Sequence, residues 1–332
     1  MKRVLLVGLG RFGANHLRVL TELEVPLGIV DVDERALEKA LEIAPGARAA
    51  TDVRDLLPEA MAASIVVPAH LHRRLAETCL EAKVPVLCEK PLAPALADAV
   101  ALCELADRAS CVLQTGFIFR YHPATRILCR LLGQGAIGTP LAIQAKFTGF
   151  KRPRTDGGCA LNDAVHFIDL ANTILGAPAR SAQATTRDWL ASGHDDVAFL
   201  TFDHAPGIVH IEAGYHTPER ARRMLVVGDE GSMICDYDAA EPIQVFRQAH
   251  RKGADGLWMA EQVAPERPPV EAGEPLRLEI EDFLANVRER RRPEADGWAG
   301  AQATAAVEAA LQSAREGKSI PVPRVGPNGA SP

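Results

Sequence analysis

The stretch GLGRFGANH, residues 8–16, decides the fold of the first part of this chain. It follows an apolar run at residues 4–7 that is typical of a buried strand, and a helical pattern begins within it. The spacing GxGxxG gives each glycine its own role. Gly8 permits a tight turn, Gly10 lets backbone approach a pyrophosphate, and Gly13 lets helix and strand pack closely. A purely structural turn is the alternative. Because a helix N-terminus also offers free amide groups, the stretch predicts a dinucleotide-binding turn.

Short apolar strands alternate with helices through the first third of the chain. Strands are expected at residues 4–7, 27–31, 64–67, 84–88 and 111–115, and helices at residues 14–23, 35–43, 73–83 and 96–108. Strands separated by helices demand parallel pairing with helices on both faces of the sheet. Residues 1–118 are therefore predicted to form an α/β, doubly wound Rossmann domain.

The pattern changes after residue 118 to longer strands joined by short turns. Strands are expected at residues 141–150, 180–189, 197–202, 208–215, 224–227, 232–237 and 243–248, and helices at residues 123–132, 163–175, 276–290 and 297–316. Turns such as FDHAPGIV indicate hairpins, so residues 119–322 are predicted to form an α+β domain with a large, mostly antiparallel open sheet. Residues 250–275 are expected to be a long loop and residues 323–332 a disordered tail.

Composition limits the class of protein. The chain has 332 residues, enough for about two domains, and 47% hydrophobic with 24% charged residues is ordinary for a globular protein. A net charge of −6 argues against nucleic acid or an anionic membrane as a partner. The seven cysteines form no CxxC pair, so neither a metal site nor a disulfide framework is predicted. No apolar run is long enough for export or for a membrane span, and a cytoplasmic protein is expected.

Asp31 ends the second predicted strand, 18 positions after Gly13. A carboxylate at that point can accept hydrogen bonds from an adenosine ribose and repels a 2′-phosphate, which favours NAD over NADP. Arg35 is close enough to leave NADP open as the weaker choice. Asp31 could instead cap the next helix, although Asp33 is better placed to do so.

Two further motifs follow strands of the predicted parallel sheet. VPAHLH, residues 67–72, contains Pro68 and His72, and VLCEKPLA, residues 86–93, contains Glu89 and Lys90. Ligands of such sheets bind beyond the carboxyl ends of the strands, where both motifs lie. A surface histidine and a soluble strand-ending turn are the alternatives for each motif taken alone.

Taken together, the motifs of this chain resemble the glucose-fructose oxidoreductase/inositol dehydrogenase family of nicotinamide-dependent enzymes. The resemblance covers most of the chain and rests on GLGRFGANH, on VPAHLH in place of Thr-Pro-x-x-x-His, on EKPLA, on FRYHP and on GGCALNDAVHFID. It implies hydride transfer between nicotinamide C4 and a secondary alcohol or ketone of a sugar, sugar nucleotide, amino sugar or cyclitol. A softer likeness points to sugar nucleotides and amino sugars. A non-catalytic NAD or sugar sensor, and a reductase of imines or non-sugar ketones, are the rival interpretations.

The resemblance also implies roles for individual residues. Lys90 would be the active-site lysine, with a cis peptide bond before Pro91. His166 would be the general acid/base, because an imidazole can carry a proton near neutral pH. The family usually has an aspartate four residues before this histidine, where this chain has Asn162 and then Asp163. Asn162 is favoured to orient the substrate or Lys90, with Asp163 as a helix cap or partner, unless a shifted turn gives Asp163 the family aspartate's role.

Three further residues are expected near the substrate. Arg120 resembles a substrate-facing family position, although a structural salt bridge is the alternative. Asp169 lies on the same helical face as His166 and could bind substrate hydroxyls. Arg152 belongs to the cationic stretch FKRPR, which could bind a phosphate or carboxylate or be a solvated loop. The expected cofactor contacts are Gly8, Gly10, Arg11, Phe12, Gly13, Asp31, Pro68, His72, Glu89 and Lys90. The open sheet of the second domain is expected to be buried in a homodimer or homotetramer.

Overall fold

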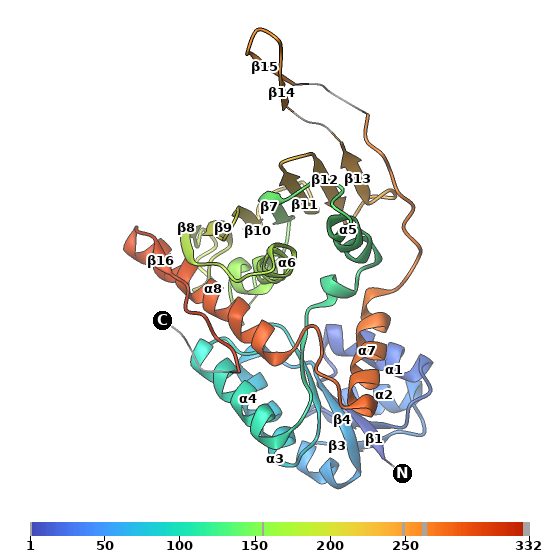
Figure 1. Ribbon diagram of the computed structural model, residues 1–332. Coiled ribbons are helices and arrows are strands. Elements are labelled where there is room, and N and C mark those ends of the chain that lie inside the picture. Colours follow the sequence, from blue (N-terminus) through green and yellow to red (C-terminus); the bar gives the residue numbers. More distant parts are fainter. Residues whose placement is uncertain (1, 155, 248–249, 261–263, 328–332) are drawn as a thin grey trace. The chain divides into compact units, whose positions relative to one another are not determined.

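The computed structural model describes residues 2–154, 156–247, 250–260 and 264–327, which form two compact units (Figure 1). The first unit contains the described residues up to 118, residues 274–304 and the segment that begins at Val325. The second unit contains the described residues of 119–273 and residues 305–324. These units differ from the predicted domains, which placed the whole of 119–322 in the second domain.

The first unit is built on a six-stranded sheet in which every recorded pair is parallel, with the order β3-β2-β1-β4-β5-β6. Its strands are β1 (Arg3–Val7), β2 (Leu27–Val30), β3 (Arg48–Ala50), β4 (Ala60–Ile65), β5 (Val86–Glu89) and β6 (Leu113–Gly116). Its helices are α1 (Arg11–Glu22), α2 (Glu34–Ile43), α3 (His72–Glu81), α4 (Leu96–Ala109) and α7 (Pro275–Glu289), with short turns η1 (Val53–Asp55), η2 (Leu57–Glu59) and η3 (Ala69–Leu71). The predicted doubly wound sheet is confirmed, and only the short strand β3 was not foreseen within it.

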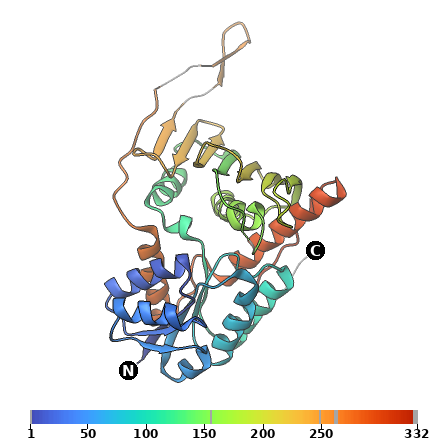
Figure 2. The same ribbon diagram turned by 180° about the vertical axis from the view of Figure 1, so that it is seen from behind.

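Two clusters of buried side chains cover the two faces of this sheet. Alternate residues of β1 divide between them, with Val4 and Leu6 in one cluster and Leu5 and Val7 in the other, as the period of a strand requires. Helices α1, α2 and α7 supply the first cluster, and α3 and α4 supply the second, so helices lie on both faces (Figure 2). Helix α7 therefore belongs to the core of the first unit, which explains why the observed units differ from the predicted domains.

The second unit is built on an eight-stranded sheet with the order β13-β12-β11-β7-β10-β9-β8-β16. Its strands are β7 (Pro140–Thr148), β8 (Ser181–Arg187), β9 (Val197–Asp203), β10 (Ile208–Gly214), β11 (Ala221–Gly228), β12 (Ser232–Asp236), β13 (Ile243–Phe246) and β16 (Ile320–Pro321). Strands β7 and β10 pair in parallel and the other recorded pairs are antiparallel, which confirms the predicted, mostly antiparallel sheet. Its helices are α5 (Pro123–Gly133) and α6 (Val165–Leu175), preceded by the turns η4 (Ile118–Tyr121) and η5 (Ala160–Ala164). Helix α8 (Gly297–Glu316) contributes residues to both units.

The predicted loop at 250–275 is wrong in its first part. Strands β14 (His250–Lys252) and β15 (Trp258–Ala260) form an antiparallel hairpin, closed by the amide of Gly253 donating to the carbonyl of Leu257. Residues 248 and 261–263 of the predicted strand and loop lie outside the described residues. In the predicted tail, Val325 packs on the first unit and its amide donates to Gln302, so the described part of the tail is ordered. The rest, residues 328–332, lies outside the described residues. Among the described helices, none has the length and the apolar character to cross a membrane.

Candidate active site

The glycine-rich turn between β1 and α1 has the shape that a pyrophosphate requires. Gly8 has φ +99°, and a Cβ there would lie 2.4 Å from the carbonyl oxygen of Val66. A Cβ at Gly13 would lie 2.1 Å from the carbonyl oxygen of Gly8, so helix and turn approach each other as closely as glycine allows. Gly10 is the N-cap of α1 without a side-chain cap, and a Cβ there would meet no atom within 4 Å. The first-turn amides of α1, flanked by the exposed Arg11 and Phe12, are thus available to phosphate oxygens.

Asp31 is fixed beside this turn by two backbone amides. Its Oδ2 accepts a hydrogen bond from the amide of Leu9 at 2.6 Å, and its Oδ1 accepts one from the amide of Asp33 at 2.9 Å. A carboxylate has lone pairs for further donors, so the group can still accept a ribose hydroxyl. Asp33 caps α2 by accepting from the amide of Arg35 at 3.0 Å, so the cap is Asp33 and not Asp31, as the sequence favoured. The turn and Asp31 together fit the adenosine and pyrophosphate parts of NAD.

The segments that follow β4 and β5 are joined by His72. Its ring is 1% exposed, with Nδ1 2.7 Å from the carbonyl oxygen of Pro91 and Nε2 2.9 Å from the carbonyl oxygen of Val67. The sequence predicted a cofactor contact for His72, whereas both ring nitrogens face backbone inside the unit. Lys90, half-buried, precedes Pro91 through a cis peptide bond, as the resemblance implied. His72 therefore ties the Lys90–Pro91 turn to the segment that contains Pro68.

Glu89 is also turned into the unit. Its side chain is buried beside His16, with 3.3 Å between Oε1 and the Nε2 of that histidine. Its Oε2 accepts from the amide of Lys90 at 3.3 Å. The sequence predicted Glu89 as a cofactor contact and did not single out His16, which lies at the ninth position of the glycine-rich stretch.

In the second unit the predicted catalytic residues lie on a widened helical turn. Asn162 and Asp163 belong to the π-turn η5, in which the amide of Val165 donates to the carbonyl of Ala160, five residues earlier. Such single-turn widenings occur often at functional sites. The turn is capped from outside the helix, because Oδ2 of Asp195 accepts from the amide of Ala160 at 2.8 Å. The sequence predicted a regular helix from residue 163 and had no signal for Asp195, which comes from a distant loop.

His166 follows the π-turn on α6 and is held between aromatic rings. It is 5% exposed, its ring centre lies 5.0 Å from that of Phe119, and it stacks on Phe147 at 5.9 Å with an angle of 14°. Aromatic neighbours on two sides fix the direction of an imidazole and lower the water content around it. The environment is suited to a histidine that passes a proton in a defined direction.

Asn162 and Asp163 point to different partners. The amide nitrogen of Asn162 donates to the carbonyl of Gly157 at 2.8 Å, and Oδ2 of Asp163 accepts from Nζ of Lys151 at 2.7 Å. Lys151 also lies over the ring of Phe147, with its nitrogen 4.2 Å from the ring centre. Burial lowers the pKa of Lys151, and the Asp163 carboxylate opposes that shift. Lys151 belongs to the FKRPR stretch, but the sequence singled out Arg152, which is exposed.

Arg120 and Asp169 bind each other. Nε of Arg120 donates to Oδ2 of Asp169 at 2.7 Å, and its Nη2 donates to Oδ1 at 2.5 Å, with exposed side-chain fractions of 13% and 2%. This is the bidentate fork expected of a strong guanidinium–carboxylate pair. Both were predicted near the substrate, and the salt bridge that the sequence left open for Arg120 is present. Within the described residues, no group of three or more His, Cys, Asp or Glu side chains is arranged to hold a metal ion.

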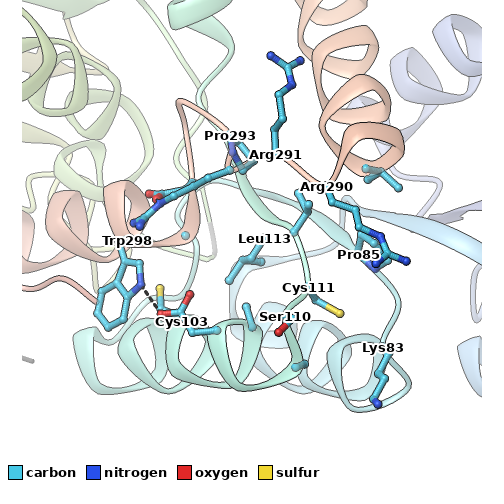
Figure 3. A pocket seen from close by; sticks show the side chains of 18 of the residues that line it. Lys83, Pro85, Cys103, Ser110, Cys111, Leu113, Arg290, Arg291, Pro293 and Trp298 are labelled. Carbon is cyan, nitrogen blue, oxygen red and sulfur yellow. Dashed lines mark hydrogen bonds and ion pairs between the residues drawn. The ribbon is translucent and has the colours of Figure 1, made fainter. Parts of the chain in front are cut away.

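A separate cavity of about 690 Å³ lies at the opposite edge of the first sheet (Figure 3). Its lining includes Pro85 just before β5 and Val112 just before β6, so it faces the amino ends of strands whose carboxyl ends carry the predicted site. Lys83 and Arg290 line it together, each next to the end of a helix and each with a positive φ. Cations stabilise helix C-termini, so the fold itself accounts for the charge of this cavity.

Comparisons with known proteins agree with the fold and the motifs. Residues 2–117 match the family described as "Oxidoreductase family, NAD-binding Rossmann fold", and residues 130–323 match "Oxidoreductase family, C-terminal alpha/beta domain". A D-apiose dehydrogenase of Paraburkholderia graminis is 28% identical over 95% of this chain and 88% of its own. A UDP-N-acetylglucosamine 3-dehydrogenase of Acidithiobacillus ferrooxidans is 29% identical over 92% of this chain and 97% of its own.

Solved structures share the fold at lower identity. A levoglucosan dehydrogenase in complex with NADH has a TM-score of 0.85 at 20% identity, and covers 98% of this chain and 100% of its own. The WlbA dehydrogenase from Bordetella pertussis, in complex with NADH and UDP-GlcNAcA, has a TM-score of 0.82 at 23% identity, with 97% and 98% covered. The chain belongs to this oxidoreductase family, and NAD as its cofactor is confirmed by the match of its first unit to the NAD-binding Rossmann fold.

Proposed function

We propose that this family member is an NAD-dependent dehydrogenase that interconverts a secondary alcohol and a ketone on a sugar, sugar nucleotide, amino sugar or cyclitol. The observation that carries the proposal is the glycine-rich turn, where Gly10 leaves open space and Asp31 is held at its side by the amide of Leu9. The activities named for the relatives, on an apiose, an inositol and a sugar nucleotide, support the substrate class. NAD, when bound, supplies the hydride acceptor.

The residues of the chain then move the proton and position the reacting groups. We assign the proton of the reacting hydroxyl to His166, whose ring is fixed by Phe119 and Phe147. Lys90 is assigned to donate a hydrogen bond to the same oxygen, where a cation stabilises developing negative charge. Asn162 is assigned to orient the substrate. The hydrogen bond that Asp163 accepts from Lys151 favours Asn162 over Asp163 for this role.

Roles in binding the substrate are proposed for four residues. Arg120 and Asp169 are assigned as a pair that shapes the site, since each satisfies the other's charge. Arg152 is exposed and is assigned to anionic substituents of the substrate, such as the phosphates of a sugar nucleotide. Tyr215 is proposed as a further contact, because its buried hydroxyl has no hydrogen-bond partner among the described residues.

Self-association through the eight-stranded sheet and a cytoplasmic location complete the proposal. Phe199 and Ile208 are 44% and 53% exposed on neighbouring strands, which favours a covered sheet face. The seven cysteines are unpaired, as in a reducing compartment. Light scattering of Phe199→Glu against the unchanged protein tests the assembly, and we expect a smaller particle for the variant. An equal mass for both proteins would refute assembly through this face.

The proposed activity is tested with two variants and a substrate panel. Lys90→Ala and His166→Ala should each lose at least about 100-fold in kcat while NADH binding, read by fluorescence, changes by less than about threefold. The panel contains sugars, inositols, UDP-sugars and a cyclic imine, followed by absorbance of the reduced cofactor. Full activity in both variants, or turnover of the imine alone, would contradict the assignment.

A further inference from the structure

A buried acid on α7 has no part in the site described above. Glu279 is 0% exposed, and neither of its carboxyl oxygens has a hydrogen-bond partner among the described residues. Removing an unpaired carboxylate ion from water is so costly that such a group stays protonated. Burial raises the pKa of Glu279 well above its usual range, and the charges of Glu89 and Asp282 raise it further.

Glu89 and Glu279 lie over the same face of strand β6. A Cβ at Gly116 would lie 2.7 Å from Oε1 of Glu89, so this carboxyl occupies the space that the glycine leaves. The backbone carbonyl of Glu279 accepts from Nε2 of Gln114 at 3.4 Å. Gln114 and Gly116 are two residues apart on one strand and point to the same side. Both acids therefore lie on this side of β6, and among the described residues Oε1 of Glu89 and both carboxyl oxygens of Glu279 have no hydrogen-bond partner.

Two N–H groups, one of His16 and one of Lys90, lie near the carboxyl oxygens of Glu89. Nε2 of His16 lies 3.3 Å from Oε1, at an ion-pair distance but outside hydrogen-bond geometry. Nδ1 of the same ring lies 3.0 Å from the hydroxyl of Ser64, and a hydroxyl that donates there leaves the ring proton on Nε2, facing Glu89. The amide of Lys90 donates to Oε2. Glu89 is thus the member of the acid pair that has N–H groups on its other sides.

We propose that Glu279 is a protonated acid that donates a hydrogen bond to Glu89, and that the cluster of His16, Glu89 and Glu279 positions the backbone of Lys90. The pair holds one proton and one negative charge between two carboxyl groups, and no bond is made or broken. Glu279 is a positioning residue because it acts through Glu89. The inference rests on the proposed function, in which Lys90 reaches the substrate oxygen.

The test compares Glu279→Gln, which keeps a neutral donor, with Glu279→Leu, which removes it. Ile280→Val is the matched control, because this neighbour on α7 is equally buried and only loses packing. Glu279→Gln and the control should keep kcat within about threefold, whereas Glu279→Leu should lose at least about tenfold in kcat with the KM for NAD little changed, because the amine is displaced. Its pH–kcat profile should also move, which packing loss alone would not cause.

A second measurement separates this inference from the proposed function. The infrared C=O stretch of a protonated carboxylic acid should be present in the unchanged protein at pH 8 and absent from Glu279→Gln. Should no substrate be turned over, the band still decides whether Glu279 is protonated. The absence of this band would overturn the inference, and so would a Glu279→Leu variant with the kcat and pH profile of the unchanged protein. A loss of kcat in Glu279→Gln equal to the loss in Glu279→Leu would also overturn the inference, because kcat would then depend on an ionised Glu279 and not on a neutral donor.

Discussion

Replacing Glu279 by glutamine should change how the stability of the protein depends on pH. In the folded protein this carboxyl has a raised pKa, because it is buried beside Glu89 and Asp282. In the unfolded chain it ionises above about pH 4.3. Between these two values the unfolded state binds one proton fewer, so the free energy of unfolding of the unchanged protein falls as pH rises. Glutamine does not titrate, so the free energy of unfolding of the variant does not fall with pH for this reason.

The size of the effect follows from one proton. Per pH unit above about pH 5, the free energy of unfolding of Glu279→Gln should gain about 1.4 kcal/mol on that of the unchanged protein. This gain continues until the folded pKa of Glu279 is reached. For a unit of this size it corresponds to a rise in Tm of about 3 to 6 °C per pH unit. His16 and the other charged neighbours are present in both proteins, so their titration largely cancels in the difference.

Thermal unfolding followed by circular dichroism between pH 5 and pH 8 measures this difference. Glu38→Gln, an exposed position on α2, removes the same charge from the surface and should show no comparable trend. A stability difference between Glu279→Gln and the unchanged protein that is constant across this range would mean that Glu279 is ionised in the fold. The physical account of the acid pair would then be refuted.

Three further predictions concern the two units. Asp169→Asn should cost about 3 to 5 kcal/mol in urea unfolding, since it removes the carboxylate charge that the buried guanidinium of Arg120 binds, while the double change Arg120→Met with Asp169→Leu should recover much of that loss; equal cost in both would contradict the pairing. Gly10→Val should weaken NADH binding by at least about tenfold and leave the melting temperature nearly unchanged, because the new side chain would enter open space at the start of α1. Gly8→Ala should lower the melting temperature, because its Cβ would meet the backbone of Val66. Calorimetry measures the melting temperatures, and fluorescence titration measures NADH binding. The unchanged enzyme should use NAD at least about tenfold better than NADP, and Asp31→Ser should narrow that ratio in kcat/KM; an unaltered ratio would remove Asp31 from the ribose.

The first sheet could be predicted because its signals are local. The apolar run of β1, the glycine spacing and the acid that ends the next strand all lie within 31 residues, and each has one mechanical reason to be there. Strand β3 was not predicted because Arg48–Ala50 is a short, largely exposed edge strand with no apolar pattern. The amphipathic face of α7, with Leu276, Ile280 and Phe283, predicted a helix but did not say which core would bury it.

For the candidate site, the sequence indicated the motifs but not the contacts that their side chains make. Asn162 and Asp163 were foreseen as alternatives, while the π-turn that separates their partners depends on Asp195, which is far away in sequence. Lys151 was visible only as one of several cations before the helix, and its place over Phe147 requires the sheet. Sequence patterns thus indicated which residue types lie in the motifs, whereas long-range packing determines which partner each side chain contacts.

The buried acids of this protein show why Glu279 stands apart. Asp169 binds a guanidinium, Asp163 binds an amine, and Asp196 accepts hydrogen bonds from two backbone amides, whereas no such partner is present for the carboxyl oxygens of Glu279 among the described residues. A cation beside Glu279 would stabilise two charges on neighbouring carboxyls and place a competing positive charge next to Lys90. A shared proton leaves one negative charge at the end of β5 instead. The Glu89 carboxylate of the proposed pair then accepts a hydrogen bond from the backbone amide of Lys90, the residue that we propose contacts the substrate oxygen.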